Sequence, residues 1–489
     1  CSLAASDFDK RQILDQHSDI RVVMVTHNET STGVTNNDLK IVAEICRSHD
    51  CLLIVDAISS LSTFFEQEAG RYDSFNNRLL AVQSHYSGIR NKENRALISH
   101  EEAQRATNQV ADQLIRLLED LGKDYNTFNT VYEAGAKQNA SGTILRIHTN
   151  KGIVGEHAFD GGPSLAEIKI VAPYLIGKNA LAREPIYNDL KRGSRHWAML
   201  GMGIIDICLW DIAGKFYDEP LYRLLGGERR PLKAYASTLH GDENGGLTTP
   251  KDFENFAQRC LEMGYKAFKV HGWGLARNNI EREVENVLNL GEKFAGKLDL
   301  LIDPACEIKN FGDALKLGKA CDEANFFWWE DPFQDNGVSQ FAHRKLRQMV
   351  KTPLLQTEHI RLLEQHVDFI VADATDYVRC GAHEDGGITG AIKIANASEG
   401  FGLDMELHGP GPVHRHVMSA IRNTNFYELG LVHPNVKTTK SKVYLDYNDD
   451  LDAIDKNGDV FAPEGPGIGV ELDWDWINSN KTGEEIIAE

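Results

Sequence analysis

Short apolar runs alternate with amphipathic segments after Pro231. Eight of these runs have the length and composition of buried strands, and helical segments lie between most of them. In chain order they are KAYAS, AFKVHGW, LDLLID, FFWWE, PLLQTE, DYVRC, LDMELH and FYELG. Eight strands alternating with helices predict a (β/α)8-type barrel over residues 233–430, whose functional side chains lie at the C-terminal strand ends.

A different pattern precedes the barrel. GTILRIHTNKGIVGEHAF predicts two strands joined by a turn at Asn150-Lys151-Gly152. Helical periodicity follows over 165–176 and again over 198–215, and the second helix is apolar on most faces, so it should be buried. We therefore predict a mixed α+β domain over residues 135–232.

The first hundred residues form a third region. An apolar strand, a polar loop, an amphipathic helix over 39–45 and a strand ending at Asp56 predict one βαβ-like unit within residues 1–68. Residues 69–134 are expected to be a connector. Within it, helical spacing of the apolar side chains over 100–121 predicts a helix; they are Val110, Leu114, Leu117, Leu118 and Leu121.

Composition narrows the possible functions. The 489 residues, enough for two or three domains, include 72 acidic and 52 basic side chains, a formal charge of −20 that disfavours nucleic acid and acidic membrane surfaces. No apolar stretch approaches the ~20 residues that span a bilayer. The eight cysteines are scattered without CxxC spacing, which favours a reduced, cytoplasmic setting. The start lacks an initiator Met and a signal-peptide core, so we expect a fragment of a longer chain.

Three acidic residues close successive predicted strands of the barrel. Asp303, Glu330 and Glu358 follow one another at steps of 27 and 28 residues, the length of one strand, one helix and two loops. Their side chains should therefore converge on one rim. Isolated buried carboxylates are costly, whereas three around a hard divalent cation form an oxygen cage suited to Mg²⁺. The sequence therefore predicts a Mg²⁺ site.

These acids belong to a larger set of motifs that resembles the enolase superfamily, mandelate racemase subgroup, over residues 135–475. The set comprises Lys269-x-His271, Asp303, Glu330-Asp331-Pro332, Glu358, Gly386-Gly387-Ile388-Thr389, His408 and Glu428. The resemblance implies a modified barrel under an α+β capping domain, over 135–232, to which residues 431–489 return. It also implies homo-oligomers and a small-molecule carboxylate substrate, an acid sugar.

The resemblance also implies roles for these residues. A base removes the proton α to the substrate carboxylate, and Mg²⁺ stabilises the resulting enediolate. Lys269 and His271 would attend one face of the substrate and His408 the other. Either Lys269 or His271 could act as the base. Glu428 would hydrogen-bond the substrate carboxylate, for which it must be protonated or paired.

The chain departs from the subgroup pattern at two strand ends. The sixth strand usually carries an Asp that pairs with the seventh-strand His, and Gly381 occupies that position here, with His383 or Asp385 as possible substitutes. The second strand has Lys-x-His where many members have Lys-x-Lys. A racemase needs matched bases on both faces, whereas dehydration needs one base and one acid. We therefore favour a hydro-lyase that converts an aldonate or aldarate to a 2-keto-3-deoxy acid, with a racemase or epimerase as the alternative.

Residues 15–62 resemble a different family, the class V aminotransferases that use pyridoxal phosphate. The resemblance rests on an ETSTG loop and a strand ending in VDA-x-SS, and implies that Asp56 would pair with the cofactor's pyridine nitrogen. No Lys occurs between Lys40 and Lys92, where the Schiff-base lysine should lie. We predict a truncated, non-functional segment over residues 1–68. A working aminotransferase and a non-catalytic binding protein are the alternatives from other classes.

Several smaller motifs are predicted to be structural. Asp455-Lys456-Asn457-Gly458-Asp459 predicts a β-turn, because Ala453 stands where a calcium loop needs its first ligand. His414-Arg415-His416 is expected on a helix surface, and Cys306 and Cys380 are expected to be small interior residues. Specificity for one acid sugar is expected to lie in loops near 126–163.

Overall fold

The computed structural model describes residues 109–124, 128–273, 279–439 and 443–488, together with the backbone of four short strands before residue 57. The chain divides into two compact units, residues 1–100 and 101–489. No helix in the described part is long and apolar enough to cross a lipid bilayer.

The first unit contains the two strands predicted around the polar loop. β1 (Val22–Thr26) pairs in parallel with β4 (Leu52–Asp56), so that Thr26 lies opposite Asp56. Two further strands, β2 (Asn28–Glu29) and β3 (Val34–Thr35), lie between β1 and β4 in the sequence and pair with each other in antiparallel orientation. The predicted helix over 39–45 and the other residues assigned to the aminotransferase-like segment lie outside the described residues.

The second unit begins with an antiparallel sheet in the order β17-β5-β6-β7. Its strands are β5 (Gln109–Lys123), β6 (Thr130–His148), β7 (Val154–Phe159) and β17 (Lys481–Ala488). The turn predicted at Asn150-Lys151-Gly152 joins β6 to β7, and Gly152 adopts a positive φ of 75° there. The C-terminal strand β17 pairs with β5, so residues 481–488 lie in the same sheet as β5.

The predicted helix over 100–121 is wrong for its described part, because residues 109–123 form the strand β5. Strand β5 pairs along most of its length with β6, and this pairing satisfies its backbone better than an isolated helix would. The helical spacing of the leucines does not describe one face: Leu114 is 2% exposed but Leu117 is 55% exposed. Tertiary pairing therefore overrides local periodicity in this segment.

The exposure difference along β5 is testable with a matched pair of variants. Leu117→Glu should leave the free energy of unfolding within about 0.5 kcal/mol of the wild type, because its side chain already meets water. Leu114→Glu should lower it by about 3 kcal/mol, because a charge would enter a buried cluster that includes Ile144 and Ile477. Urea denaturation of both variants measures the difference, and equal losses would contradict the strand assignment.

Helices cover the sheet and complete the predicted capping region. The 165–176 segment forms α6 (Pro163–Val171) and the 3-10 helix η1 (Ala172–Leu175), followed by α7 (Arg183–Gly193). Helix α8 (Leu200–Tyr217) is buried along almost its whole length up to Gly214, as its apolar composition predicts. A short helix, α9 (Leu221–Leu224), follows and ends shortly before Gly226.

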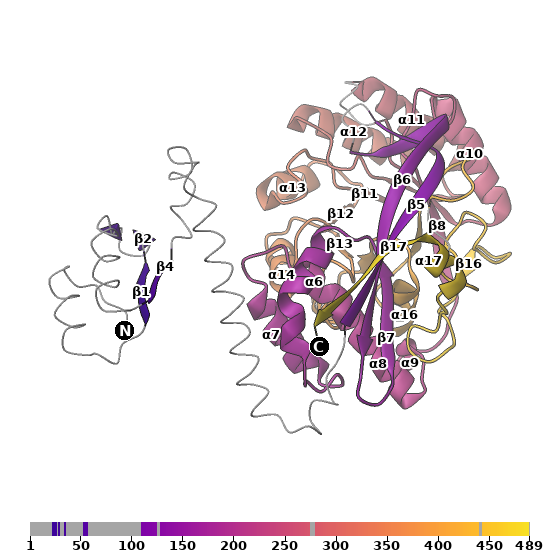
Figure 1. Ribbon diagram of the computed structural model, residues 1–489. Coiled ribbons are helices and arrows are strands. Elements are labelled where there is room, and N and C mark those ends of the chain that lie inside the picture. The colour runs from indigo at the N-terminus through magenta and orange to yellow at the C-terminus, as the bar shows by residue number, and fades with distance from the viewer. Residues whose placement is uncertain are drawn as a thin grey trace. The chain divides into compact units, whose positions relative to one another are not determined.

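The eight strands predicted after Pro231 are all present and form a parallel, nearly closed barrel (Figure 1). Sequential strands are neighbours from β8 to β14, and β15 pairs with β8. The strands are β8 (Leu232–Thr238), β9 (Ala267–Val270), β10 (Asp299–Ile302), β11 (Trp328–Glu330), β12 (Leu354–Gln356), β13 (Tyr377–Cys380), β14 (Met405–Leu407) and β15 (Tyr427–Val432).

Seven helices follow successive strands of the barrel. They are α10 (Pro250–Met263), α11 (Ile280–Phe294), α12 (Phe311–Ala324), α13 (Gln340–Arg347), α14 (Leu362–Val371), α15 (Gly387–Gly400) and α16 (Pro412–Ala420). Their apolar faces pack on the outer surface of the strands in one continuous core. A smaller cluster that includes Tyr235, Leu301 and Trp328 fills the barrel interior. This packed interior fixes the strand ends that carry the site.

The C-terminal segment contributes two further elements besides β17. Strand β16 (Asp459–Val460) pairs antiparallel with β8, and α17 (Trp474–Asn480) precedes β17. The predicted β-turn is present before β16, where the Gly458 amide donates to the Asp455 carbonyl at 3.0 Å. The Asp455 carboxylate accepts from the amides of Asn457 and Asp459, which accounts for the acidic residue at this position.

Candidate functional site

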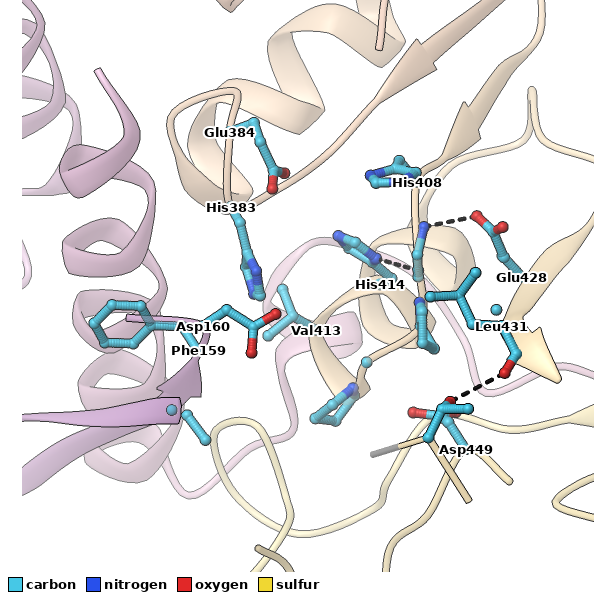
Figure 2. Close-up of a pocket in the computed structure, with 18 of the residues that line it drawn as sticks. Phe159, Asp160, His383, Glu384, His408, Val413, His414, Glu428, Leu431 and Asp449 are labelled. Atoms are coloured by element: carbon cyan, nitrogen blue, oxygen red, sulfur yellow. Dashed lines mark hydrogen bonds between the residues drawn. The ribbon is translucent and has the colours of Figure 1, made fainter. Parts of the chain in front are cut away.

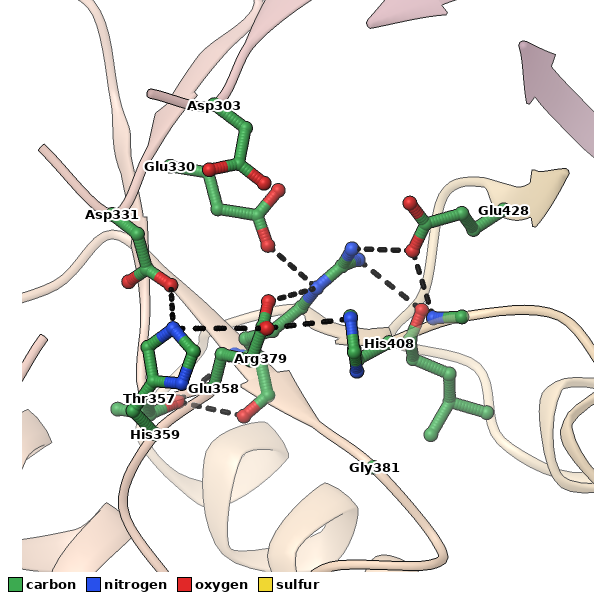
Figure 3. A network of polar contacts seen from close by, with 12 residues as sticks. Asp303, Glu330, Asp331, Thr357, Glu358, His359, Arg379, Gly381, His408 and Glu428 are labelled. Carbon is green, nitrogen blue, oxygen red and sulfur yellow. Dashed lines mark hydrogen bonds and ion pairs between the residues drawn. The ribbon is translucent and has the colours of Figure 1, made fainter. Parts of the chain in front are cut away.

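The three predicted metal ligands come together at the C-terminal ends of neighbouring strands (Figure 3). Asp303 directly follows β10, Glu330 is the last residue of β11, and Glu358 lies two residues beyond β12. One carboxylate oxygen from each lies within 4.8 Å of the others. Asp303 and Glu330 are buried and Glu358 is partly exposed, so the group opens towards solvent on one side.

Lys269, on β9, lies against these acids. Its Nζ is 3.1 Å from Asp303 Oδ2, 2.8 Å from Glu330 Oε2 and 3.2 Å from Glu428 Oε1. Burial lowers the pKa of Lys269, but the surrounding carboxylates, Glu330 first, raise the pKa well above its ordinary value. Lys269 is therefore the charged partner of the acids in this arrangement.

Arg379 is a second buried cation in the site, and sequence reasoning missed it. It projects from β13 into the barrel, where its Nε is 2.7 Å from Glu330 Oε1 and its Nη2 is 2.6 Å from Glu428 Oε2 (Figure 3). Nη2 also donates to the Tyr235 hydroxyl at 3.0 Å. The sequence did contain a sign of this role, because an arginine stands in the otherwise apolar strand YVRC beside the site.

Glu428, the last predicted site residue of the barrel, is paired rather than protonated. Burial raises its pKa, but the charges of Lys269 and Arg379 lower the pKa well below its ordinary value. The Gly409 amide also donates to Glu428 Oε2 at 2.8 Å. Of the two states that the sequence allowed for Glu428, the structure contains the ion-paired carboxylate.

His271 lies two residues beyond Lys269 and faces the same acids. Its Nδ1 is 2.6 Å from the Thr238 carbonyl, which can only accept, so Nδ1 carries a proton and donates it. Its Nε2 lies 3.3 Å from Asp303 Oδ2. This bond to the backbone orients the ring and leaves Nε2 as the nitrogen on the side of the acids.

His408 follows β14 on the other side of Glu358. Its Nε2 lies 3.3 Å from Glu358 Oε1, and 39% of its side-chain surface remains exposed. Burial and the positive charge of Arg379 both lower the pKa of His408. The negative charges of Glu358, Glu428 and Glu384 outweigh them and raise this pKa above its ordinary value. His271 and His408 thus flank the carboxylates from opposite directions.

Neither residue suggested from the sequence substitutes for the missing Asp at Gly381. The His383 ring turns towards the sheet, where its Nε2 lies 2.8 Å from His157 Nε2. Asp385 is buried, and its carboxylate accepts from the amides of Gly381 and Leu362. His383 therefore contacts His157, and Asp385 bonds to backbone amides, so neither side chain pairs with His408.

The prediction that His414-Arg415-His416 lies on a helix surface is wrong. His414, Arg415 and His416 lie on helix α16, but all three are buried rather than on its surface. His414 Nδ1 bonds to the Gly409 carbonyl and its Nε2 accepts from the Ala382 amide, which links the sixth and seventh strand ends. The polar sequence concealed the burial because backbone groups satisfy these rings.

A second set of side chains lies beyond the three acids. Cys306, Asp331 and His359 bring potential ligand atoms within 4.8 Å of one another. His359 Nε2 is 3.0 Å from Asp331 Oδ2, and this carboxylate raises the pKa of His359 to about 9 against the effect of burial. Cys380 is buried, as expected of a small interior residue, whereas Cys306 is only partly buried. Burial raises the pKa of the Cys306 thiol.

A pocket of about 660 Å³ opens over the acids, and part of its lining is shown in Figure 2. Barrel residues, including Lys269, His271 and His408, form one part of its wall. The antiparallel sheet contributes Arg116, Thr143, His157 and Asp160, and the C-terminal segment contributes Tyr444 and Tyr447. The segment predicted to carry specificity, residues 126–163, therefore contributes to the pocket wall, but mainly from the strands β6 and β7 and not from loops.

Comparisons with family models place most of the second unit in known families. Residues 252–476 match the model described as "Enolase C-terminal domain-like", and residues 127–226 match "Mandelate racemase / muconate lactonizing enzyme, N-terminal domain". A third model, "Effector-associated domain 11", matches residues 54–122, a segment that includes most of β5.

Individual relatives agree with these models. The chain is 25% identical to the arabinonate dehydratase of Saccharolobus solfataricus, over 62% of this chain and 79% of that protein. It is 21% identical to an N-succinyl-L-Arg/Lys racemase of Bacillus cereus, over 73% and 95%. Among solved structures, D-glucarate dehydratase from Agrobacterium tumefaciens, complexed with magnesium, has a TM-score of 0.68 and 26% identity, covering 78% of this chain and all of that one.

Proposed function

Because this chain is an enzyme of the enolase superfamily, in the mandelate racemase and muconate lactonizing enzyme family, we propose that it is a Mg²⁺-dependent dehydratase of an acid sugar. The proposal depends mainly on one observation, the convergence of Asp303, Glu330 and Glu358. His271 lies beside Asp303 and His408 lies beside Glu358. The reaction would remove the proton α to the carboxylate and the β-hydroxyl, giving a 2-keto-3-deoxy acid.

The donor set suits a hard divalent cation. Asp303, Glu330 and Glu358 offer only carboxylate oxygens, and Glu358 borders the open pocket, where substrate and water could complete the coordination. These three residues would hold Mg²⁺. When bound, the ion would stabilise the negative charge that develops on the substrate carboxylate as the α-proton leaves.

His271 is the base in this proposal. Lys269 is 1% exposed, and its ammonium group contacts Asp303, Glu330 and Glu428. Glu428 is not one of the proposed Mg²⁺ ligands, so loss of the Lys269 proton would leave this buried carboxylate with Arg379 as its remaining cation. His271 Nδ1 donates to Thr238, and its Nε2 faces the acids with a lone pair available in the neutral ring. The α-proton would pass to His271 Nε2 while Lys269 keeps its charge.

His408 is the acid. Besides Glu358, whose charge the bound ion would offset, Glu428 and Glu384 raise the pKa of His408, so both favour the protonated ring. In the second half of the reaction the bond between the β-carbon and its hydroxyl breaks, and His408 gives that oxygen a proton so that water leaves. The enol that remains takes up a proton at the β-carbon, releases the proton of its C2 hydroxyl to solvent, and becomes the 2-keto acid.

The pocket lining supports a hydroxylated substrate. Arg116, Asp160 and His157 on the sheet face the same cavity as the catalytic side chains, and Arg116 pairs with Asp160 at 3.1 Å. Such groups can donate to and accept from the hydroxyl groups of an aldonate or aldarate.

A screen of acid sugars with Mg²⁺ tests the proposal, with formation of a 2-keto acid as the readout. The same reactions in D₂O separate it from racemisation, which the similarity to a racemase keeps in view. Dehydration predicts keto acid with deuterium at C3. Recovered substrate with deuterium at an inverted C2 and no keto acid would replace the proposal with a racemase.

Removing the acid should separate the two halves of the reaction. In His408→Asn, 2-keto acid formation should fall by about 10²- to 10⁴-fold, because no imidazole protonates the leaving hydroxyl. Exchange of the α-proton with D₂O should persist, because His271 and the three carboxylates remain. NMR of recovered substrate measures the exchange. Loss of exchange and dehydration to the same extent would place His408 in proton abstraction instead.

A further inference from the structure

The absence of a side chain at Gly381 leaves a space beside His408. Strands β13 and β14 pair in parallel with Cys380 opposite Leu407, and the His408 amide donates to the Cys380 carbonyl at 2.9 Å. The next residues in this register are Gly381 and His408. A side chain at position 381 would therefore emerge next to the His408 ring.

The carboxylate of Glu384 occupies this space. A Cβ built on Gly381 would lie 2.1 Å from Glu384 Oε2, closer than two such atoms can approach. The φ angle of Gly381 lies outside the left-handed region, so its backbone would accept an ordinary residue. The three atoms nearest to such a Cβ all belong to the Glu384 side chain, and one of them is a carboxylate oxygen that lies where an Asp at position 381 would begin.

A tight turn after β13 holds Glu384 in this position. The amides of Glu384 and Asp385 both donate to the Gly381 carbonyl, at 3.1 Å and 2.8 Å. The buried Asp385 carboxylate accepts from the Gly381 amide at 3.0 Å, which closes the turn. Since His383 is directed towards His157, Glu384 is the acidic side chain of this turn that lines the pocket with His408 (Figure 2).

The electrostatics of the turn agree with this placement. Burial raises the pKa of Glu384, but the nearby histidines His383, His408 and His414 lower it, and the net effect is a lowered pKa. The Glu384 carboxylate is therefore stabilised in its anionic form.

We propose that Glu384 is the positioning residue that orients the His408 ring, acting from the turn after β13 in place of a side chain at position 381. A carboxylate beside one ring nitrogen fixes the tautomer and the direction of the other nitrogen. Nε2 of His408 faces Glu358 at 3.3 Å, so the proposal assigns the other ring nitrogen, Nδ1, to Glu384, whose carboxylate lies more than 4.0 Å from it in this structure. The inference rests on the proposed dehydration, in which His408 is the acid.

Moving the carboxylate from position 384 to position 381 tests the inference. Three variants differ only at these two positions: E384A, G381A/E384A and G381D/E384A. We expect E384A to lower kcat about 10- to 100-fold with KM nearly unchanged. G381D/E384A should recover most of this loss, whereas G381A/E384A, which adds only a methyl group, should not. Glu364→Gln, on the exposed side of α14, serves as the unaffected control.

The ¹⁵N spectrum of the histidine rings in the Mg²⁺-free protein gives a readout that does not depend on turnover. The His408 signals are assigned by their loss in His408→Asn. At a pH high enough for the His408 ring to be neutral, we expect E384A to change the ratio of the two His408 tautomers and G381D/E384A to restore it. An unchanged ratio in E384A, or equal recovery by the alanine and aspartate variants, would overturn the inference. A wild-type protein inactive on every acid sugar would instead refute the proposed function, while this spectrum still decides the role of Glu384.

Discussion

Glu330→Gln should lower kcat for dehydration by at least about 10³-fold, equivalent to about 4 kcal/mol of transition-state stabilisation. Glu330 is fully buried between Asp303 and Glu358, so the amide would remove one of the three anionic oxygen donors without changing the size of the side chain. Affinity for Mg²⁺, measured by calorimetry, should fall together with kcat.

Glu406→Gln is the matched control for this variant. Glu406 is also fully buried on a barrel strand, but its carboxylate accepts from the amides of Asn425 and Phe426, away from the pocket. Its replacement should leave Mg²⁺ affinity unchanged and kcat within about twofold, since it contacts neither the ion nor the substrate. Undiminished turnover of Glu330→Gln on all substrates would show that the three carboxylates do not form the metal site.

Arg379→Met should lower the free energy of unfolding by about 3–5 kcal/mol at pH 7. The guanidinium is fully buried and contacts Glu330 and Glu428, so its removal leaves buried carboxylates without one of their two cations. Arg347→Met is the control, because that guanidinium is 30% exposed and pairs with Asp376 outside the barrel. Its loss should cost about 1 kcal/mol or less.

The same variant should change how stability depends on pH. Lys269 and Arg379 hold the pKa of Glu428 well below its ordinary value, so this carboxylate stabilises the fold above its unfolded pKa of about 4.3. That stabilisation is lost as the pH falls towards the folded pKa. Without Arg379 the folded pKa rises, so urea denaturation between about pH 5 and about pH 3 should show a smaller acid-dependent loss. Equal pH dependence in both proteins would contradict this role of Arg379.

The barrel was predictable because its signals are local. Each strand is a short apolar run, and a parallel strand buried on both faces needs little else to be recognised. The spacing of Asp303, Glu330 and Glu358 then determined which strand ends are neighbours, since sequential strands lie side by side in a barrel. The hairpin at Gly152 was equally local, because a short turn determines its own geometry.

The strand β5 was not predictable in the same way. Its leucines have helical spacing, and only pairing with β6 and β17 shows that Leu114 is buried and Leu117 is not. Pairing partners of this strand include β17, more than 350 residues away along the chain. Contacts of this range leave no periodicity in the segment itself.

The sequence by itself determined the fold class, the three carboxylates and the histidines on either side of them, because these depend on residue type and on spacing along neighbouring strands. Only the tertiary structure decided the charge balance of the site. It showed that Arg379 and Lys269 neutralise the buried acids and that Glu384 fills the space left by Gly381. Charge pairing and steric exclusion act over a few ångströms between residues distant in sequence, so the folded chain had to bring these groups together before either effect could be recognised.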